Sequence, residues 1–110
     1  MEDLEKGILE WIAIHSDSAE LSSQIASATV QRRDFMGTGL FLYLNVPADQ
    51  PDVPANVRPV CPHIESEMLM DGAGCNLFMK NGQLHYLEVY SRGGFMPERL
   101  QDWRLGPNSP

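Results

Sequence analysis

The stretch CNLFMKNGQLHYLEVY, residues 75–90, decides the fold because it predicts a β-hairpin with a defined register. Asn81-Gly82 is the residue pair that best tolerates the positive φ angles of a two-residue type I′ turn. With that turn, Glu88 shares one strand face with Leu84, Tyr86 and Tyr90, because side chains alternate along a strand. The expected pairs are Lys80 with Gln83, Met79 with Leu84, Leu77 with Tyr86 and Cys75 with Glu88.

Glu88 is the one carboxylate in this otherwise apolar and aromatic strand. If its face is buried, an isolated carboxylate would cost several kcal/mol, so it needs a donor. We therefore predict that Glu88 and Arg33 form a structural polar pair that holds the hairpin in place. Two alternatives remain open: Glu88 is a general acid or base in a pocket, or it lies exposed at an edge or bulge.

A second hairpin is predicted upstream of the first. Residues 25–36 are rich in β-prone residues, Gly37-Thr-Gly39 marks a turn, and LFLYLNV follows. In the second strand the leucines at 40, 42 and 44 share one face, whereas Phe41 and Tyr43 share the other. We expect Phe41 and Tyr43 to contact something other than the core, either a partner or a second copy of the chain.

Two helices are predicted before these strands. The first places Leu4, Ile8, Trp11 and His15 on one stripe, and Asp17 and Glu20 have the spacing of a capping box for a second helix through about Gln24. Five of the eight prolines fall in residues 47–62, which predicts a long, stiff loop. A short strand near 64–70 completes the pattern.

These elements predict an α+β fold: an antiparallel sheet of about four or five strands with one or two N-terminal helices packed on one face. The chain has 110 residues, a length typical of one domain. We expect a single domain over residues 1–105 and a frayed C-terminal tail over residues 106–110.

Charge is distributed unevenly along the chain. The net charge is −7, and residues 1–55 contain nine acids and three bases. Nucleic acid is not an expected partner, because phosphate binding needs clustered Lys and Arg. No apolar run is long enough to cross a membrane, and the N-terminus is acidic where a secretory signal would be basic. We therefore expect a cytoplasmic protein that makes no membrane contact.

Two stretches together resemble a known family. They are Arg33-Asp-Phe-Met-Gly-Thr-Gly-Leu-Phe41 and the glycine-led hairpin Gly72-Ala-Gly-Cys-Asn-Leu-Phe-Met-Lys-Asn-Gly-Gln-Leu-His-Tyr-Leu-Glu-Val-Tyr90. Both are similar to parts of a family of small, uncharacterised bacterial proteins, some of which occur beside toxin genes as candidate immunity proteins. The resemblance implies an α+β fold and an inhibitory role. It implies no catalytic residues, because none are established for that family.

The functional expectation is a non-enzymatic protein-binding module, an immunity-like inhibitor of a basic toxin domain, because an acidic surface attracts a basic partner. The alternatives are a small ligand-binding protein or enzyme with a pocket near Glu88 and the proline-rich loop, and a homodimer. Cys61, His63, Cys75 and His85 lack the spacing of a compact zinc site, so we expect no metal, no cofactor and no catalytic residue. The expected binding residues are Glu2, Asp3, Glu5, Glu10, Asp17, Glu20, Asp49, Asp52, Phe41 and Tyr43.

Overall fold

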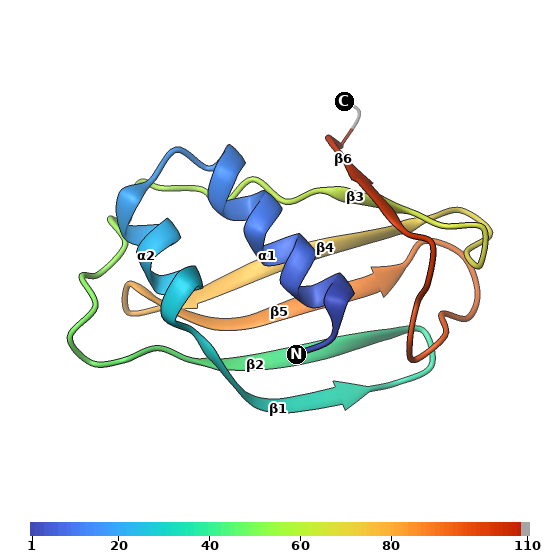
Figure 1. The fold of residues 1–110 in the computed structure, drawn as a ribbon, viewed down its shortest axis with the longest axis horizontal. Helices are drawn as coiled ribbons and strands as arrows, with labels where there is room; N and C mark the ends of the chain where they lie inside the picture. The colour runs from blue at the N-terminus through green and yellow to red at the C-terminus, as the bar shows by residue number, and fades with distance from the viewer. Residues whose placement is uncertain (109–110) are drawn as a thin grey trace.

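Two helices and one six-stranded antiparallel sheet make up residues 1–108, the part of the chain that this computed structural model describes (Figure 1). The strand order in the sheet is β1-β2-β5-β4-β3-β6. The α+β prediction is confirmed, and the strand count is slightly higher than expected. The elements are α1 (Asp3–His15), α2 (Ala19–Ser27), β1 (Thr29–Phe35), β2 (Gly39–Asn45), β3 (His63–Glu65), β4 (Ala73–Lys80), β5 (Gln83–Ser91) and β6 (Arg104–Gly106).

Both helices pack on the same face of the sheet, and the core lies between the two layers (Figure 1). Leu4 and Ile8 are buried as the helical stripe predicted, but the stripe continues through Leu9 and Ile12, and His15 is exposed. On β2, the predicted alternation is confirmed, since the leucines are buried and Phe41 and Tyr43 lie on the other side. The principal core residues are Leu4, Ile8, Leu9, Ile12, Leu21, Leu40, Leu42, Leu44, Ile64, Leu77, Leu84, Leu87 and Val89.

The β4–β5 hairpin has the predicted turn but not the predicted register. Asn81 and Gly82 both have positive φ angles, 53° and 78°, and the pairs next to the turn are as expected. Beyond them a bulge leaves His85 without a partner, so Tyr86 pairs with Phe78 and Glu88 pairs with Asn76. The predicted pairs of Leu77 with Tyr86 and of Cys75 with Glu88 are therefore wrong.

The physical reason for the bulge is the spacing of the aliphatic side chains on β5. Leu84, Leu87 and Val89 are all buried, yet Leu84 and Leu87 are three residues apart and would point to opposite faces of a regular strand. One extra residue at His85 returns them to the same face. The bulge therefore turns Tyr86 and Glu88 away from the helices.

The link between the helices differs from the predicted capping box. Ser18, not Asp17, caps α2, because its Oγ accepts a hydrogen bond from the Leu21 amide at 3.2 Å. Asp17 has a positive φ of 50° in the turn that precedes the cap. The helix then continues past Gln24 to Ser27.

Within the predicted tail, residues 106–108 make contacts with the rest of the chain. Gly106 of β6 pairs with His63 of β3. The Asn108 side chain donates to the Cys61 carbonyl at 2.8 Å and accepts from Arg92 at 3.1 Å. The predicted strand near 64–70 is limited to His63–Glu65. Residues 109 and 110 of the predicted tail lie outside the described part of the chain.

The proline-rich segment 47–62 joins β2 to β3 without a strand of its own and passes along α2 and the tip of the β4–β5 hairpin (Figure 1). The Val53 amide donates to the Gly82 carbonyl at 2.8 Å. The fully buried Gln24 side chain donates to the Pro51 and Gly82 carbonyls and accepts from the Leu84 amide. One amide side chain therefore holds α2, the loop and the hairpin together. Within residues 1–108, no helix has the length and apolar character that crossing a membrane requires.

Candidate functional site

The side of the sheet opposite the helices forms a surface that we term the outer face. The bulge at His85 determines its composition, because it places Tyr86 and Glu88 there, opposite Phe78 and Asn76 of β4. Phe41 and Tyr43 join them from β2, where Phe41 pairs with Glu88 and Tyr43 with Tyr86. The residues of the outer face are Arg32, Asp34, Phe41, Tyr43, Asn76, Phe78, Tyr86, Glu88 and Tyr90.

Four aromatic rings of the outer face form a continuous cluster around Tyr86. The centroid of its ring lies 4.5 Å from Phe78, 5.5 Å from Tyr43 and 5.7 Å from Phe41. Phe78 is 39% exposed, and the other three rings are partly exposed. Because neither helix covers these rings, a contiguous aromatic surface remains in contact with solvent, which is typical of an interaction site.

Half of this aromatic cluster is predictable from the sequence pattern of β2, and the other half is not. Phe41 and Tyr43 were predicted to face away from the core, and they do. The predicted pair of Leu77 with Tyr86 implied that Phe78 and Tyr86 lie on opposite faces of the hairpin, whereas the two rings pair and stack. The three-residue spacing of Leu84 and Leu87 is the signal that could have predicted the bulge. A regular strand cannot bury both of these side chains on one side.

Glu88 lies in the middle of the outer face, between Phe41 of β2 and Asn76 of β4. Its side chain is partly exposed and makes no hydrogen bond or ion pair with any residue that the structure describes. The predicted pair with Arg33 is therefore wrong. Arg33 pairs with Leu42 across the strands, so its side chain points toward the helices and away from Glu88.

Arg33 bonds to a glutamate other than the predicted one, Glu5 of α1. Its Nε donates to Glu5 Oε1 of α1 at 3.1 Å, and its Nη2 donates to the Glu98 carbonyl at 2.8 Å. Glu5 is only 1% exposed. The expectation that Glu5 faces a partner is therefore wrong, because its carboxylate is enclosed between α1 and β1.

Arg32 on the outer face and Arg92 near it already have partners. Arg32 binds Asp34 at 3.0 Å, and its guanidinium lies 4.3 Å from the centroid of the Tyr43 ring. Arg92 donates to His63 Nδ1 at 3.1 Å and also to Asn108. Within residues 1–108, this arrangement leaves Glu88 as a carboxylate without a cation, beside the aromatic ring of Phe41.

We expect the substitution Glu88→Gln to leave stability almost unchanged. The carboxylate makes no bond within residues 1–108 that the amide would lose, so the free energy of unfolding should change by less than about 0.5 kcal/mol, as for ordinary surface positions. Urea denaturation at neutral pH is the measurement. A loss of several times that size would show that Glu88 has a structural partner after all.

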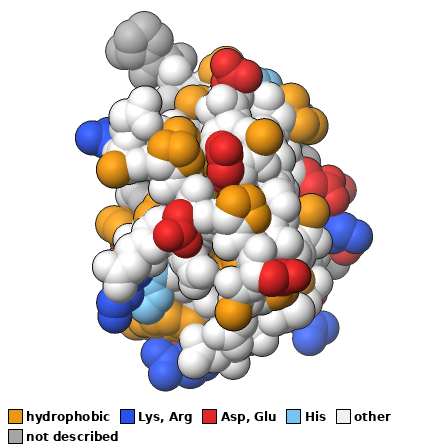
Figure 2. All heavy atoms as spheres, turned by 90° about the vertical axis from the view of Figure 1, so that its left-hand side faces the viewer, with side chains coloured by type: hydrophobic (Ala, Val, Ile, Leu, Met, Phe, Trp, Pro, Cys, Tyr) orange, Lys and Arg blue, Asp and Glu red, His pale blue; other side chains and the backbone are white. Residues whose placement is uncertain are grey.

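The predicted acidic residues do not form one surface with Phe41 and Tyr43. Glu2 pairs with Arg99 at 3.1 Å, and Asp3 and Glu10 are exposed on α1, on the helical side of the sheet. The end of the molecule formed by α2 and the proline-rich loop has scattered acidic side chains (Figure 2). The predicted acids in this region are Asp17, Glu20, Asp49 and Asp52.

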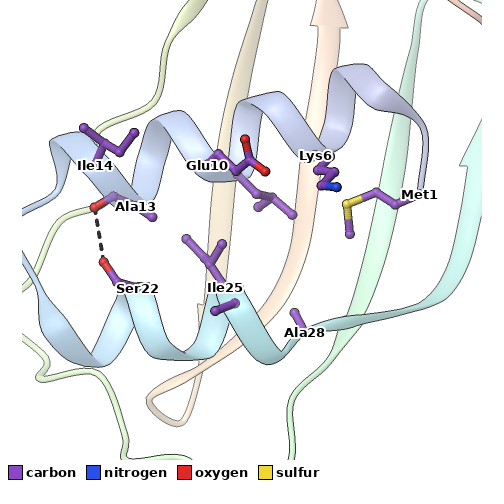
Figure 3. Close-up of a pocket in the computed structure, with 10 residues that line it drawn as sticks. Met1, Lys6, Glu10, Ala13, Ile14, Ser22, Ile25 and Ala28 are labelled. Atoms are coloured by element: carbon purple, nitrogen blue, oxygen red, sulfur yellow. Dashed lines mark hydrogen bonds between the residues drawn. The ribbon is translucent and has the colours of Figure 1, made fainter.

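A separate apolar groove lies between α1 and α2, with a volume of ≈ 590 Å³ (Figure 3). Leu9, Ala13, Ile14 and Ile25 are among the residues that line it, together with Lys6 and Glu10. Neither this groove nor the smaller hollow between the start of α1 and residues 96–100 is lined by Glu88 or by the proline-rich loop. The groove and Glu88 lie on opposite sides of the sheet.

The four residues considered as zinc ligands divide into separate groups. The Cys75 sulfur lies at the Pro62 carbonyl, one residue after Cys61, and His63 bonds to Glu65 and Arg92. The His85 ring lies 6.2 Å from that of Tyr43 at the margin of the outer face. In residues 1–108, no three His, Cys, Asp or Glu side chains are placed to hold one metal ion.

Comparison of the chain with protein-family models, with curated proteins and with solved structures finds no match. The resemblance to candidate immunity proteins therefore stays a prediction.

Proposed function

We propose that the protein is a non-enzymatic protein-binding module and that its outer face docks a partner with a basic side chain at Glu88. The observation that supports this proposal is a carboxylate without a cationic partner in the described chain, set within a cluster of partly exposed aromatic rings. An Arg or Lys that enters this cluster can pair with the carboxylate and stack on the rings.

The outer face has the composition of an interface centre. Tyr and Phe supply large contact areas for little loss of conformational entropy, and Tyr is enriched among the residues that dominate binding energy. Arg32 over the Tyr43 ring is an example, within the chain, of the cation–aromatic contact that we propose for the partner. A partner would also cover Phe78, the most exposed ring of the cluster.

The acids on the helical side contribute to attraction over distance rather than to contact. The molecule measures 19 Å along its shortest axis, whereas charges are screened over about 8 Å at physiological salt. The net charge of −7 should therefore speed association with a basic partner at low salt. The contact at Glu88 should persist at higher salt. An immunity-like inhibitor bound to a basic toxin domain is a pair of this kind.

Two charge-reversal variants test the proposed face against the rest of the surface. Glu88→Lys lies on the outer face, and Glu10→Lys makes the same change of net charge on the exposed side of α1, beside the groove. The full chain and both variants are immobilised and incubated with native cell lysate at low and high salt. The proteins that each one retains are identified by mass spectrometry. We expect a stoichiometric basic partner whose affinity falls at least about tenfold with Glu88→Lys.

The matched variant decides between a local contact and a general effect of charge. Glu10→Lys should keep the partner at moderate salt, because it leaves the outer face intact. Equal losses for both variants, or a loss with Glu10→Lys alone, would contradict docking at the outer face. Circular dichroism of each variant checks that the fold is retained.

A small-ligand function is the second candidate, and the groove between α1 and α2 favours it. Its volume of ≈ 590 Å³ falls in the range of small-molecule pockets, and most of its lining is apolar (Figure 3). A ligand bound there would raise the melting temperature in a saturable way. Filling the groove by Ala13→Phe would remove that response and leave the Glu88-dependent retention unchanged, so the two functions are separable.

A further inference from the structure

Two cysteines from distant parts of the sequence meet beside β4. Cys75 is buried in β4, and its Sγ donates to the Pro62 carbonyl at 3.3 Å. Cys61 precedes Pro62, is partly exposed, and packs against the core. The Cys61 carbonyl accepts from Asn108 Nδ2 at 2.8 Å. These two hydrogen bonds link the end of the proline-rich segment, Cys61-Pro62, to Cys75 of β4 and to Asn108.

The two thiols have different chemical roles because of their surroundings. The neighbouring Cys75 thiol lowers the pKa of Cys61 to about 7, and the Leu77 backbone acts in the same direction, although burial opposes the shift. The neighbouring Cys61, together with burial, raises the pKa of Cys75, and only the Arg92 charge acts in the opposite direction. At neutral pH Cys61 is thus a partly ionised and reachable sulfur, and Cys75 is a protonated thiol beside it.

We propose that Cys61 and Cys75 are an oxidation-sensitive dithiol that hydrogen peroxide converts into an intramolecular disulfide. The Cys61 thiolate attacks one peroxide oxygen, the O–O bond breaks, and the departing hydroxide takes a proton to become water, which leaves a sulfenic acid on Cys61. The Cys75 sulfur then attacks the Cys61 sulfur. The S–O bond breaks, and the hydroxyl leaves as water with the Cys75 proton. Two thiols and one peroxide become one disulfide and two waters.

The disulfide would fasten the proline-rich segment to the sheet covalently. The closed loop, residues 61–75, contains β3 and the turn at Gly72, so oxidation would restrict the unfolded chain and slow detachment of that segment. The dithiol is separate from the outer face. On β4, Asn76 and Phe78 are exposed on the outer face, whereas Cys75 is buried on the other side of the sheet.

Peptide mapping of the full chain tests the proposal. The protein is treated with hydrogen peroxide, blocked with iodoacetamide, digested without reductant and analysed by mass spectrometry. We expect a cross-linked peptide that contains Cys61 and Cys75 and that dithiothreitol separates. In the Cys75→Ser variant, dimedone should instead label Cys61 as a sulfenic acid, since no second thiol is present to resolve it. The Cys61→Ser variant should resist both reagents.

The pH profile of alkylation gives an independent measurement that needs no oxidant. Because the thiolate is the nucleophile, the rate of Cys61 labelling in the reduced protein should rise with pH and reach half its maximum near pH 7. Cys75 should label only after unfolding. Disulfides solely between molecules, a peroxide-treated protein that keeps both thiols, or labelling of Cys75 as fast as Cys61 would each overturn the proposal.

Discussion

Replacement of Arg33 by Met should lower the free energy of unfolding by about 3 kcal/mol or more, the cost of leaving a buried carboxylate without its partner. Glu5 is 1% exposed, and its hydrogen bond to Arg33 Nε is 3.1 Å long. Removal of the guanidinium also breaks the bond to the Glu98 carbonyl, which holds the 96–100 segment to β1. Urea denaturation followed by circular dichroism measures the loss.

Two further variants identify the cause of that loss. Arg32 is the neighbouring residue on β1, points to the outer face, and binds Asp34 with both side chains well exposed. Arg32→Met should therefore cost less than about 1 kcal/mol, as for other exposed ion pairs. The double variant Glu5→Leu/Arg33→Met should recover most of the stability lost in Arg33→Met, because no charge is then left buried. Similar losses for Arg32→Met and Arg33→Met would refute the special role of the Glu5 pair.

Replacement of Gln24 by Leu should lower the free energy of unfolding by about 3 kcal/mol, because it removes the partner of the buried Leu84 amide and breaks two part-buried bonds to carbonyls. The side chain is fully buried and donates to the Pro51 and Gly82 carbonyls at 2.8 and 2.9 Å, while its Oε1 accepts from the Leu84 amide at 3.0 Å. Leucine is similar in volume but supplies none of these bonds. The Gly82 carbonyl keeps one partner, the Val53 amide.

The loss in Gln24→Leu should be accompanied by a local change in the proline-rich segment. Limited proteolysis should cut within residues 47–62 faster in the variant than in the parent chain, because the segment loses its link to α2. Gln101→Leu is a matched control on an exposed residue, and it should change neither stability nor cleavage. An unaltered cleavage rate in Gln24→Leu would show that other contacts order the loop.

The sequence determined the local elements of this protein. Asn81-Gly82 specified the turn of the central hairpin because few residue pairs accept two positive φ angles. The alternation from Leu40 to Leu44 specified which side of β2 is buried, and the prolines excluded a strand from residues 47–62. These features follow from the chemistry of neighbouring residues, and together they were sufficient for the α+β class.

The tertiary structure alone decided which charges are buried and which side chains form the outer face. Glu5 lies among the buried positions of α1 and has Arg33 as its partner, and no local pattern joins two residues so far apart in sequence. The bulge at His85 is favoured because it buries Leu84, Leu87 and Val89 together. That gain exists only when the helices cover one side of the sheet. Burial is a property of the assembled layers, so the face that presents Glu88 and Tyr86 was determined only when helices and sheet packed together.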